Sequence, residues 1–126
     1  IEQTQNDLFA DRQLRLMIEN GNRQVVGIVD LCSFDPLHNR AEVGIMVDKS
    51  CRRQGIGRNA LALLEEHCFR YLGIHQLFAY IAVENLPSRR LFAACGYKES
   101  AVLKEWAHTF GGGYTDVLVV QKLNLS

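Results

Sequence analysis

The chain has 126 residues, 48% of them hydrophobic and 22% charged, a composition ordinary for one globular domain with a buried core. Lysine plus arginine and aspartate plus glutamate both total 14, so the formal net charge is zero. This balance argues against a basic surface for nucleic acid or for a membrane. The four cysteines form no C-x-x-C pair, and we find no signal peptide and no membrane-spanning apolar run. We therefore expect a reduced, cytoplasmic protein.

The first third of the chain predicts a β-hairpin. Residues 1–13 are polar and without a clear period, which fits the tail of a helix or a disordered lead-in. Apolar and polar residues alternate over 14–19, which predicts a half-buried strand. Asn20-Gly21-Asn22 predicts a tight turn, because Asn-Gly tolerates a positive φ. The returning strand is expected over 25–34.

A third antiparallel strand is predicted over 40–47, where Gly44 indicates a bulge or the close approach of a ligand to the backbone. A long amphipathic helix is predicted over 57–72, with Glu65 largely on its solvated side and Gly73 ending it. Its apolar stripe consists of Leu61, Leu64, Cys68 and Tyr71.

The rest of the chain predicts one β-α unit and a final hairpin. Residues 76–83 include apolar side chains at both odd and even positions, which would point to opposite faces of a strand. This pattern indicates a central strand covered on both faces. A helix follows with Pro87 in its first turn and Gly96 after its end. Two strands, 98–108 and 114–122, flank a glycine-rich turn. The order β-β-β-α-β-α-β-β predicts one mixed α+β domain over residues 1–126.

A phosphate-binding turn is predicted at the start of the first helix. Two glycines there permit a tight turn and a close backbone approach. The first helical N–H groups lack internal acceptors and carry the positive end of the helix dipole, and nearby arginines add charge. The stretch is Arg52, Arg53, Gln54, Gly55, Ile56, Gly57 and Arg58.

Two other readings of these patterns are weaker. Gly55-x-Gly57-x-x-Ala60 with Glu84 downstream matches a dinucleotide fingerprint, but seven mostly polar residues separate the glycines from the preceding strand. The hairpins at both ends also differ from a repeated parallel β-α core. Glu65-Glu66-His67-Cys68 lacks the spacing of a metal site, so no metal is expected.

Two motifs in order resemble the GNAT family of N-acetyltransferases. Arg52-x-x-Gly55-x-Gly57 matches the family's acyl-CoA signature, and Asn85-x-x-Ser88 followed by Gly96-Tyr97 matches its second helix. The resemblance runs from about Leu14 to Leu123. The tail from Lys104 to Val119, with its long strand, glycine-rich hairpin and Tyr-x-Asp return, resembles the branch of the ribosomal-protein and spermidine (diamine) N-acetyltransferases. The family's usual first strand and most of the helices after it are not recognisable before Leu14.

The resemblance implies acetyl-CoA as cosubstrate and a primary amine as acceptor, on a protein N-terminus, a small amine or a polyamine. The pyrophosphate would lie on the backbone of Gln54 to Arg58, with Arg52 and Arg53 nearby. The pantetheine arm would pair with Ile45, Met46 and Val47, and Asn85 and Ser88 would hold it. The family resemblance also makes a homodimer plausible.

Glu42 is the candidate general base, on the strand beside the expected thioester, and it could instead bind a cationic acceptor. Many family members place a tyrosine, the acid for the departing thiolate, where Phe92 stands, and phenylalanine has no proton to donate. Phenylalanine at this position slightly disfavours the assignment of the chain to the polyamine branch of the family. The open donors are Ser88, water, Tyr80, Cys95 and Tyr97. A non-catalytic acyl-CoA-binding module and, less favoured, a dinucleotide-binding protein remain as alternatives.

Overall fold

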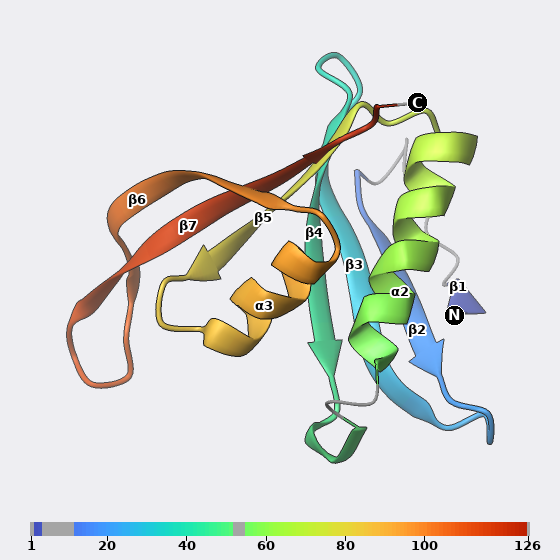
Figure 1. Ribbon diagram of the computed structural model, residues 1–126, viewed down its shortest axis with the longest axis horizontal. Coiled ribbons are helices and arrows are strands. Elements are labelled where there is room, and N and C mark those ends of the chain that lie inside the picture. Colours follow the sequence, from blue (N-terminus) through green and yellow to red (C-terminus); the bar gives the residue numbers. More distant parts are fainter. Residues whose placement is uncertain (1, 4–11, 52–54, 126) are drawn as a thin grey trace.

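The computed structural model describes residues 2–3, 12–51 and 55–125, and Figure 1 shows two helices packed on one side of a twisted sheet. The described strands form a seven-stranded sheet in the order β1-β2-β3-β4-β5-β7-β6, antiparallel throughout except between β4 and β5. The strands are β1 (Glu2–Gln3), β2 (Leu14–Glu19), β3 (Val25–Asp35), β4 (Arg40–Val47), β5 (Gln76–Ala82), β6 (Lys98–His108) and β7 (Tyr114–Leu123). The helical segments are the 3-10 turn η1 (Lys49–Cys51), α2 (Ile56–Glu66), the π-helical turn η2 (His67–Tyr71) and α3 (Leu86–Ala94).

The predicted α+β class and the order of its elements are confirmed. The structure adds β1, which pairs with β2 at the edge of the sheet, where the sequence predicted no strand. The predicted helix tail or disordered lead-in falls mainly on residues 4–11, which lie outside the described residues.

One hydrophobic core fills the space between the sheet and the two helices. On β5, Leu77, Ala79 and Ile81 are buried in it, as their alternation requires. Phe78 and Tyr80 point to the opposite face, where Tyr80 is 45% exposed. The prediction that β5 is covered on both faces is therefore wrong, because both described helices pack on the same side of the sheet.

The β2–β3 turn forms where it was predicted, but for a different reason. The Asn20 side-chain oxygen accepts hydrogen bonds from the backbone N–H groups of Asn22 (2.8 Å) and Gln24 (3.0 Å). The positive φ of 60° belongs to Arg23, whereas Gly21 has no positive φ. The asparagine side chain, more than glycine's conformational freedom, thus stabilises this turn.

The first helix begins at Ile56 and changes to a π-helical turn after Glu66. Leu61, Leu64 and Cys68 are buried as predicted. Tyr71 is 70% exposed, because the wider π turn rotates it off the apolar stripe. Glu65, expected on the solvated side, is buried, and its carboxylate lies 2.7 Å from the Lys122 ammonium of β7.

The two central strands diverge. β4 pairs with β5 only through Arg40, Ala41 and Glu42, and beyond Glu42 the described β5 residues pair with β7 alone. Gly44 itself lies in regular register with Asp30, so of the two expectations for it, a bulge or the close approach of a ligand, the bulge is absent. The irregularity lies on β3, at Ser33, whose φ is 50°. The separation of β4 from β5 opens the sheet at the edge that faces the helix N-termini.

Candidate active site

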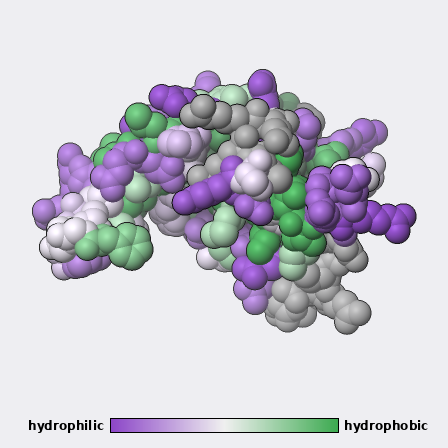
Figure 2. All heavy atoms as spheres, turned by 90° about the horizontal axis from the view of Figure 1, so that it is seen from below, coloured by the Kyte–Doolittle hydropathy of each residue, from purple (hydrophilic) through white to green (hydrophobic). Residues whose placement is uncertain are grey.

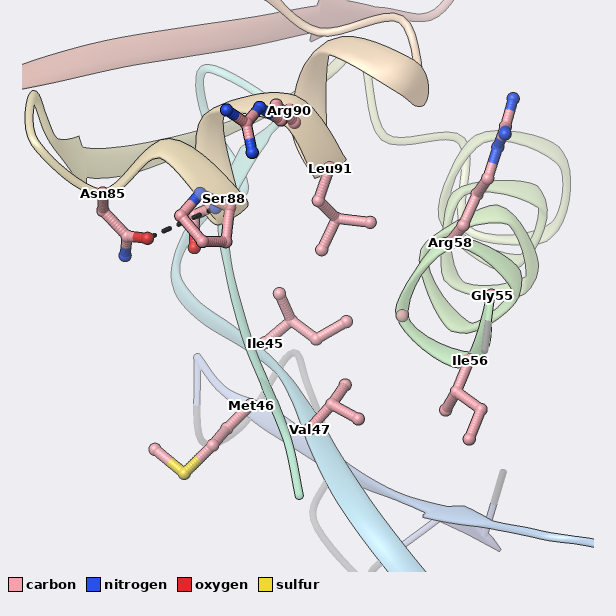
Figure 3. A pocket seen from close by; sticks show the side chains of 12 residues that line it. Ile45, Met46, Val47, Gly55, Ile56, Arg58, Asn85, Ser88, Arg90 and Leu91 are labelled. Carbon is pink, nitrogen blue, oxygen red and sulfur yellow. Dashed lines mark hydrogen bonds between the residues drawn. The ribbon is translucent and has the colours of Figure 1, made fainter. Parts of the chain in front are cut away.

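A pocket of about 800 Å³ lies where the end of β4 meets the first turns of α2 and α3 (Figure 3). Its described lining is Ile45, Met46, Val47, Gly55, Ile56, Gly57, Arg58, Asn85, Pro87, Ser88, Arg90 and Leu91. Nine of these twelve residues were predicted from the sequence as donor-binding residues. Arg52, Arg53 and Gln54 lie outside the described residues. The structure brings the nine predicted residues together around one pocket, and the binding of acetyl-CoA by these residues stays a prediction.

The N-terminus of α2 contributes to this pocket backbone N–H groups that have no acceptor within the helix. Gly55 is its N-cap residue, with a φ of 75° that suits glycine and no side chain to cap the helix. The amides of the next three residues, Ile56 to Arg58, have no acceptor within the helix. The first turn holds no acidic side chain. The helix therefore presents N–H groups and a positive dipole end that suit an anion.

Gly57 is closely packed, and its φ, which is not positive, does not itself favour glycine. A Cβ atom at this position would lie 3.3 Å from Leu91 Cδ2 and 3.6 Å from Val47 Cγ2. Glycine thus lets α2 approach both α3 and the end of β4. The two glycines of the motif have separate physical reasons, a left-handed backbone at Gly55 and close packing at Gly57.

The end of β4 is held by a third glycine, which sequence reasoning missed. Gly27 of β3 pairs with Val47, and a Cβ atom on Gly27 would lie 2.5 Å from the Met46 carbonyl oxygen and 3.2 Å from the Val47 Cα. Because these are backbone atoms, a side chain at Gly27 would push the β4 end out of place. Its signal in the sequence was a glycine inside a strand pattern, which predicts a close backbone approach.

The α3 wall combines a helix cap with apolar surface. The Asn85 side-chain oxygen accepts a hydrogen bond from the Ser88 N–H at 3.3 Å, drawn as a dashed line in Figure 3. Asn85 is thus the N-cap of α3, and this structural role accompanies the ligand contact expected of it. Pro87, Arg90 and Leu91 were missed, because only the family's motif residues were taken from this helix. The helical spacing from Pro87 to Leu91, four residues apart, could have found the last of them.

Glu42 is not among the pocket-lining residues. Its neighbours Ala41 and Val43 are buried against the helices, so Glu42 points to the opposite face of the sheet. There it is half-buried, opposite Cys32 on β3 and beside Phe78 on β5. The pKa of the Cys32 thiol is raised, first by burial and then by the charge of Glu42. Glu42 stands at the last β4–β5 pair, where the sheet begins to open.

The structure separates the candidate proton donors for a leaving thiolate. Phe92 is 3% exposed, and its ring meets the edge of the Tyr97 ring at 4.9 Å between centroids. Burial raises the pKa of Tyr97, and its buried hydroxyl has no hydrogen-bond partner in the described chain. Burial also raises the pKa of the Cys95 thiol. Of the four candidate side chains, Ser88 is the one that lines the pocket.

Two features together define the class of acyl-CoA-dependent acyltransferases. The sheet opens between β4 and β5, and the N-terminus of a helix that suits a phosphate group lies beside the opening. The chain belongs to the GNAT acetyltransferase family, because the model of the acetyltransferase (GNAT) domain matches residues 2–98. The predicted family, fold class and enzyme class, an acetyl-CoA-dependent N-acetyltransferase acting on an amine, are thereby confirmed. The acyl-CoA-binding module and the dinucleotide protein are not favoured.

Individual relatives agree with this assignment. The chain is 26% identical over 118 residues to spermidine N(1)-acetyltransferase of Vibrio cholerae, covering 93% of this chain and 68% of the relative. It is 34% identical over 102 residues to a putative phosphinothricin acetyltransferase of Bacillus subtilis, covering 76% of this chain and 59% of the relative. The dodecameric structure of the Vibrio cholerae spermidine N-acetyltransferase superposes with a TM-score of 0.85 at 25% identity, over 93% of this chain and 68% of that one.

The described residues contain neither a group of side chains that could bind a metal ion nor a helix able to span a membrane. In this part of the chain, no three histidine, cysteine, aspartate or glutamate side chains are grouped as a metal site would need. Within the same residues, no helix combines the length and the apolar character that crossing a membrane demands.

Proposed function

We propose that this enzyme acetylates a primary amine of a polyamine, and that donor and acceptor meet at β4 from opposite faces of the sheet. One observation carries the proposal: β4 and β5 part after Glu42, with the pocket on the helix side and Glu42 on the other. The similarity to a spermidine acetyltransferase supports a polyamine, although Phe92 departs from the tyrosine expected in that branch.

The donor would bind in three parts. The pyrophosphate of acetyl-CoA lies on the amides of Gly55 to Arg58, where the helix supplies donors and positive charge. The extended pantetheine arm follows β4 at Ile45 to Val47, because a strand edge that has left its neighbour can pair with an extended ligand. A backbone N–H near Ile45 or Met46 then polarises the thioester carbonyl.

The acceptor approaches from the face that carries Glu42. An aliphatic amine with a pKa of about 10.4 is mostly protonated at neutral pH and must lose a proton before it attacks. Glu42 takes that proton, directly or through one water, and releases it to solvent, and the neutral nitrogen then bonds to the carbonyl carbon. The tetrahedral intermediate then loses the remaining extra proton from its nitrogen to Glu42 or to water and expels the CoA thiolate. A water, or the Ser88 hydroxyl with its own proton replaced from water, protonates the sulfur. The residues of this chain supply binding, orientation and proton transfer, and the proposed steps use no metal.

The setting of the enzyme is proposed on separate grounds. The scattered cysteines and the lack of a C-x-x-C pair fit a cytoplasmic protein. A dodecameric relative supports assembly of this chain into an oligomer, of which a homodimer is the smallest form. Light scattering of the purified protein tests the assembly.

The direct test is Glu42→Gln, assayed by thiol release from acetyl-CoA with spermidine as acceptor. We expect kcat to fall by about a hundredfold or more, with the KM for acetyl-CoA within about twofold of the wild type. Glu66→Gln on the outer side of α2 is the matched control and should leave both constants unchanged, since Glu66 pairs only with the exposed Arg70 in the described chain.

An unchanged kcat in Glu42→Gln removes Glu42 from the base role. Absence of thiol release with every amine in a panel, together with tight acetyl-CoA binding, would favour a non-catalytic acyl-CoA-binding module. Thermal stabilisation by NAD but not by acetyl-CoA would overturn the proposed donor.

A further inference from the structure

Two polar side chains on the helix side of the sheet have hydrogen-bonding capacity that the described chain leaves unused. Tyr97 is 4% exposed and Glu65 is 7% exposed. The Tyr97 hydroxyl and Glu65 Oε1 are both shielded from solvent, and neither has a hydrogen-bond partner among the described residues. A buried oxygen without a partner costs free energy, and folded proteins keep few of them. The two atoms therefore point to a ligand inside the protein.

Both atoms belong to one cluster. The Lys122 ammonium of β7 lies 2.7 Å from Glu65 Oε1 and also donates a hydrogen bond to the carbonyl of Cys95, two residues before Tyr97. The contact between Lys122 and Glu65 is an ion pair by distance, without the alignment of a hydrogen bond. Burial has the largest effect on the pKa of Tyr97 and raises it, and the charge of Glu65 raises it further. The phenol and the carboxylate thus lie near enough to interact.

The chemistry of this cluster suits water. The phenol of Tyr97 stays protonated because its pKa is raised, so it can donate a hydrogen bond. A carboxylate oxygen accepts more than one hydrogen bond, so Glu65 Oε1 keeps acceptor capacity beside the Lys122 ammonium. Water can accept from the first group and donate to the second. Buried waters typically make about three hydrogen bonds to buried polar groups, and Lys122 supplies a further donor in the same cluster.

We propose that an internal water molecule binds between α2 and the turn from α3 to β6, where it accepts a hydrogen bond from the Tyr97 hydroxyl and donates one to Glu65. With Lys122, this water would join α2, β7 and the segment that follows α3. Neither Tyr97 nor Glu65 lines the acetyl-CoA pocket. The water site is therefore part of the scaffold that holds the two pocket-lining helices, and it does not depend on the proposed donor or acceptor.

Oxygen-17 relaxation dispersion of the water signal tests this site, because it detects waters that stay in a protein for longer than the time of its rotation. Tyr97→Phe removes the hydroxyl and keeps the ring that meets Phe92 at 4.9 Å between centroids. We expect the dispersion amplitude to fall by the contribution of one long-lived water. Tyr114→Phe is the matched control and should leave the amplitude unchanged, because Tyr114 is 64% exposed.

Urea titrations of the same variants give an independent readout, because the sign of the change differs between a hydrated and a bare hydroxyl. If water bonds to the hydroxyl, Tyr97→Phe removes a hydrogen bond, and its urea midpoint should fall below that of the wild type. A bare buried hydroxyl costs stability, so its removal would raise the midpoint. A raised midpoint, or an unchanged dispersion amplitude in folded Tyr97→Phe, would overturn the proposal.

A second variant tests whether Glu65 shares the same water. Lys122→Met combined with Glu65→Leu removes both partners of the ion pair, so that neither leaves the other buried and unpaired. This double variant should lose one long-lived water, and the addition of Tyr97→Phe should cause no further loss. Losses that add up in the triple variant would assign separate waters to the two groups and would overturn the bridge between them.

Discussion

The two ends of the first helix differ in how completely their polar groups are satisfied. At the pocket, α2 starts at Gly55 without a side-chain cap, so its first amides have no acceptor within the helix or from the side chain of the cap residue. At the far end, Gly73 adopts a φ of 65° and the Ile74 N–H donates to the Cys68 carbonyl at 2.9 Å, which closes the last turn. The ion pair between the buried Glu65 and the half-buried Lys122 lies near this closed end. The Gly73 end of the helix, its closed end, is thus anchored to the fold. The Gly55 end, its open end, faces the pocket.

This division implies that stability and donor binding can be changed separately. In α3 the two roles meet instead, because Asn85 caps the helix and also lines the pocket. Changes at the closed end of α2 should affect unfolding, changes at its open end should affect acetyl-CoA, and changes at Asn85 should affect both.

The largest expected effect is that of Lys122→Met at the closed end. The Lys122 ammonium lies 2.7 Å from Glu65 Oε1 and 2.5 Å from the Cys95 carbonyl oxygen. Its removal leaves a buried carboxylate without a partner, and the free energy of unfolding should fall by about 3 kcal/mol or more in urea titrations. The double variant Lys122→Met with Glu65→Leu should recover much of this loss. A comparable loss of acetyl-CoA affinity in folded protein would contradict the separation of the two ends.

The converse change is Gly57→Glu at the open end. The new carboxylate would enter the space between α2, Leu91 and Val47, and would repel the phosphates of the donor. Acetyl-CoA affinity, measured by calorimetry, should fall about a hundredfold or more. Gly57→Gln, which has similar bulk without charge, separates the steric effect from the electrostatic one. Unaltered affinity in Gly57→Glu would refute the assignment of this turn to the donor.

Asn85→Ala should change both properties by smaller amounts. Loss of the cap should lower the free energy of unfolding by about 1 kcal/mol. Asn85→Asp keeps an oxygen that can accept the Ser88 N–H but loses the amide donor. It should therefore restore stability without restoring acetyl-CoA affinity. If Asn85→Asp restores both, Asn85 has no donor contact of its own and is only a cap.

The smallest effect is a pH dependence at the closed end. Burial raises the pKa of Glu65 above its usual 4.5, and the nearby Lys122 only partly offsets this. Because the folded state then binds the proton more tightly than the unfolded state, this group costs stability as pH rises from about 4.5 through its folded pKa. The free energy of unfolding of the wild type minus that of Glu65→Gln should accordingly decrease from pH 4 to pH 7. A difference that increases over this range would show that the ion pair outweighs burial.

Most of the fold could be predicted from local patterns. The alternation over Leu14–Glu19 and Arg40–Val47 and the glycines after both helices are short-range signals, and the structure confirms the elements they predict. Tyr71 and Glu65 were misplaced because a π turn and a distant lysine on β7 decide their surroundings. Phe78 and Tyr80 were misplaced because sequence does not show that both helices pack on one side.

The residues of the candidate site that belong to a sequence motif could be predicted. The residues whose role depends on tertiary contacts could not. Gly55, Gly57 and Ser88 stand at motif positions, so residue type and spacing are enough to name them. Gly27 and Arg90 are different, because Gly27 matters through its approach to the Met46 carbonyl and Arg90 through its place in the pocket lining.

By itself the sequence determined the family, the order of the elements and the turn that is expected to carry the donor's phosphates. These depend on residue type and local spacing, which act through backbone conformation and amphipathic period. Only the tertiary structure decided that Glu42 and the pocket lie on opposite faces of a sheet that opens between β4 and β5. It also decided that Gly55 leaves one end of α2 open while Lys122 anchors the other, because these contacts join residues that are far apart in the chain.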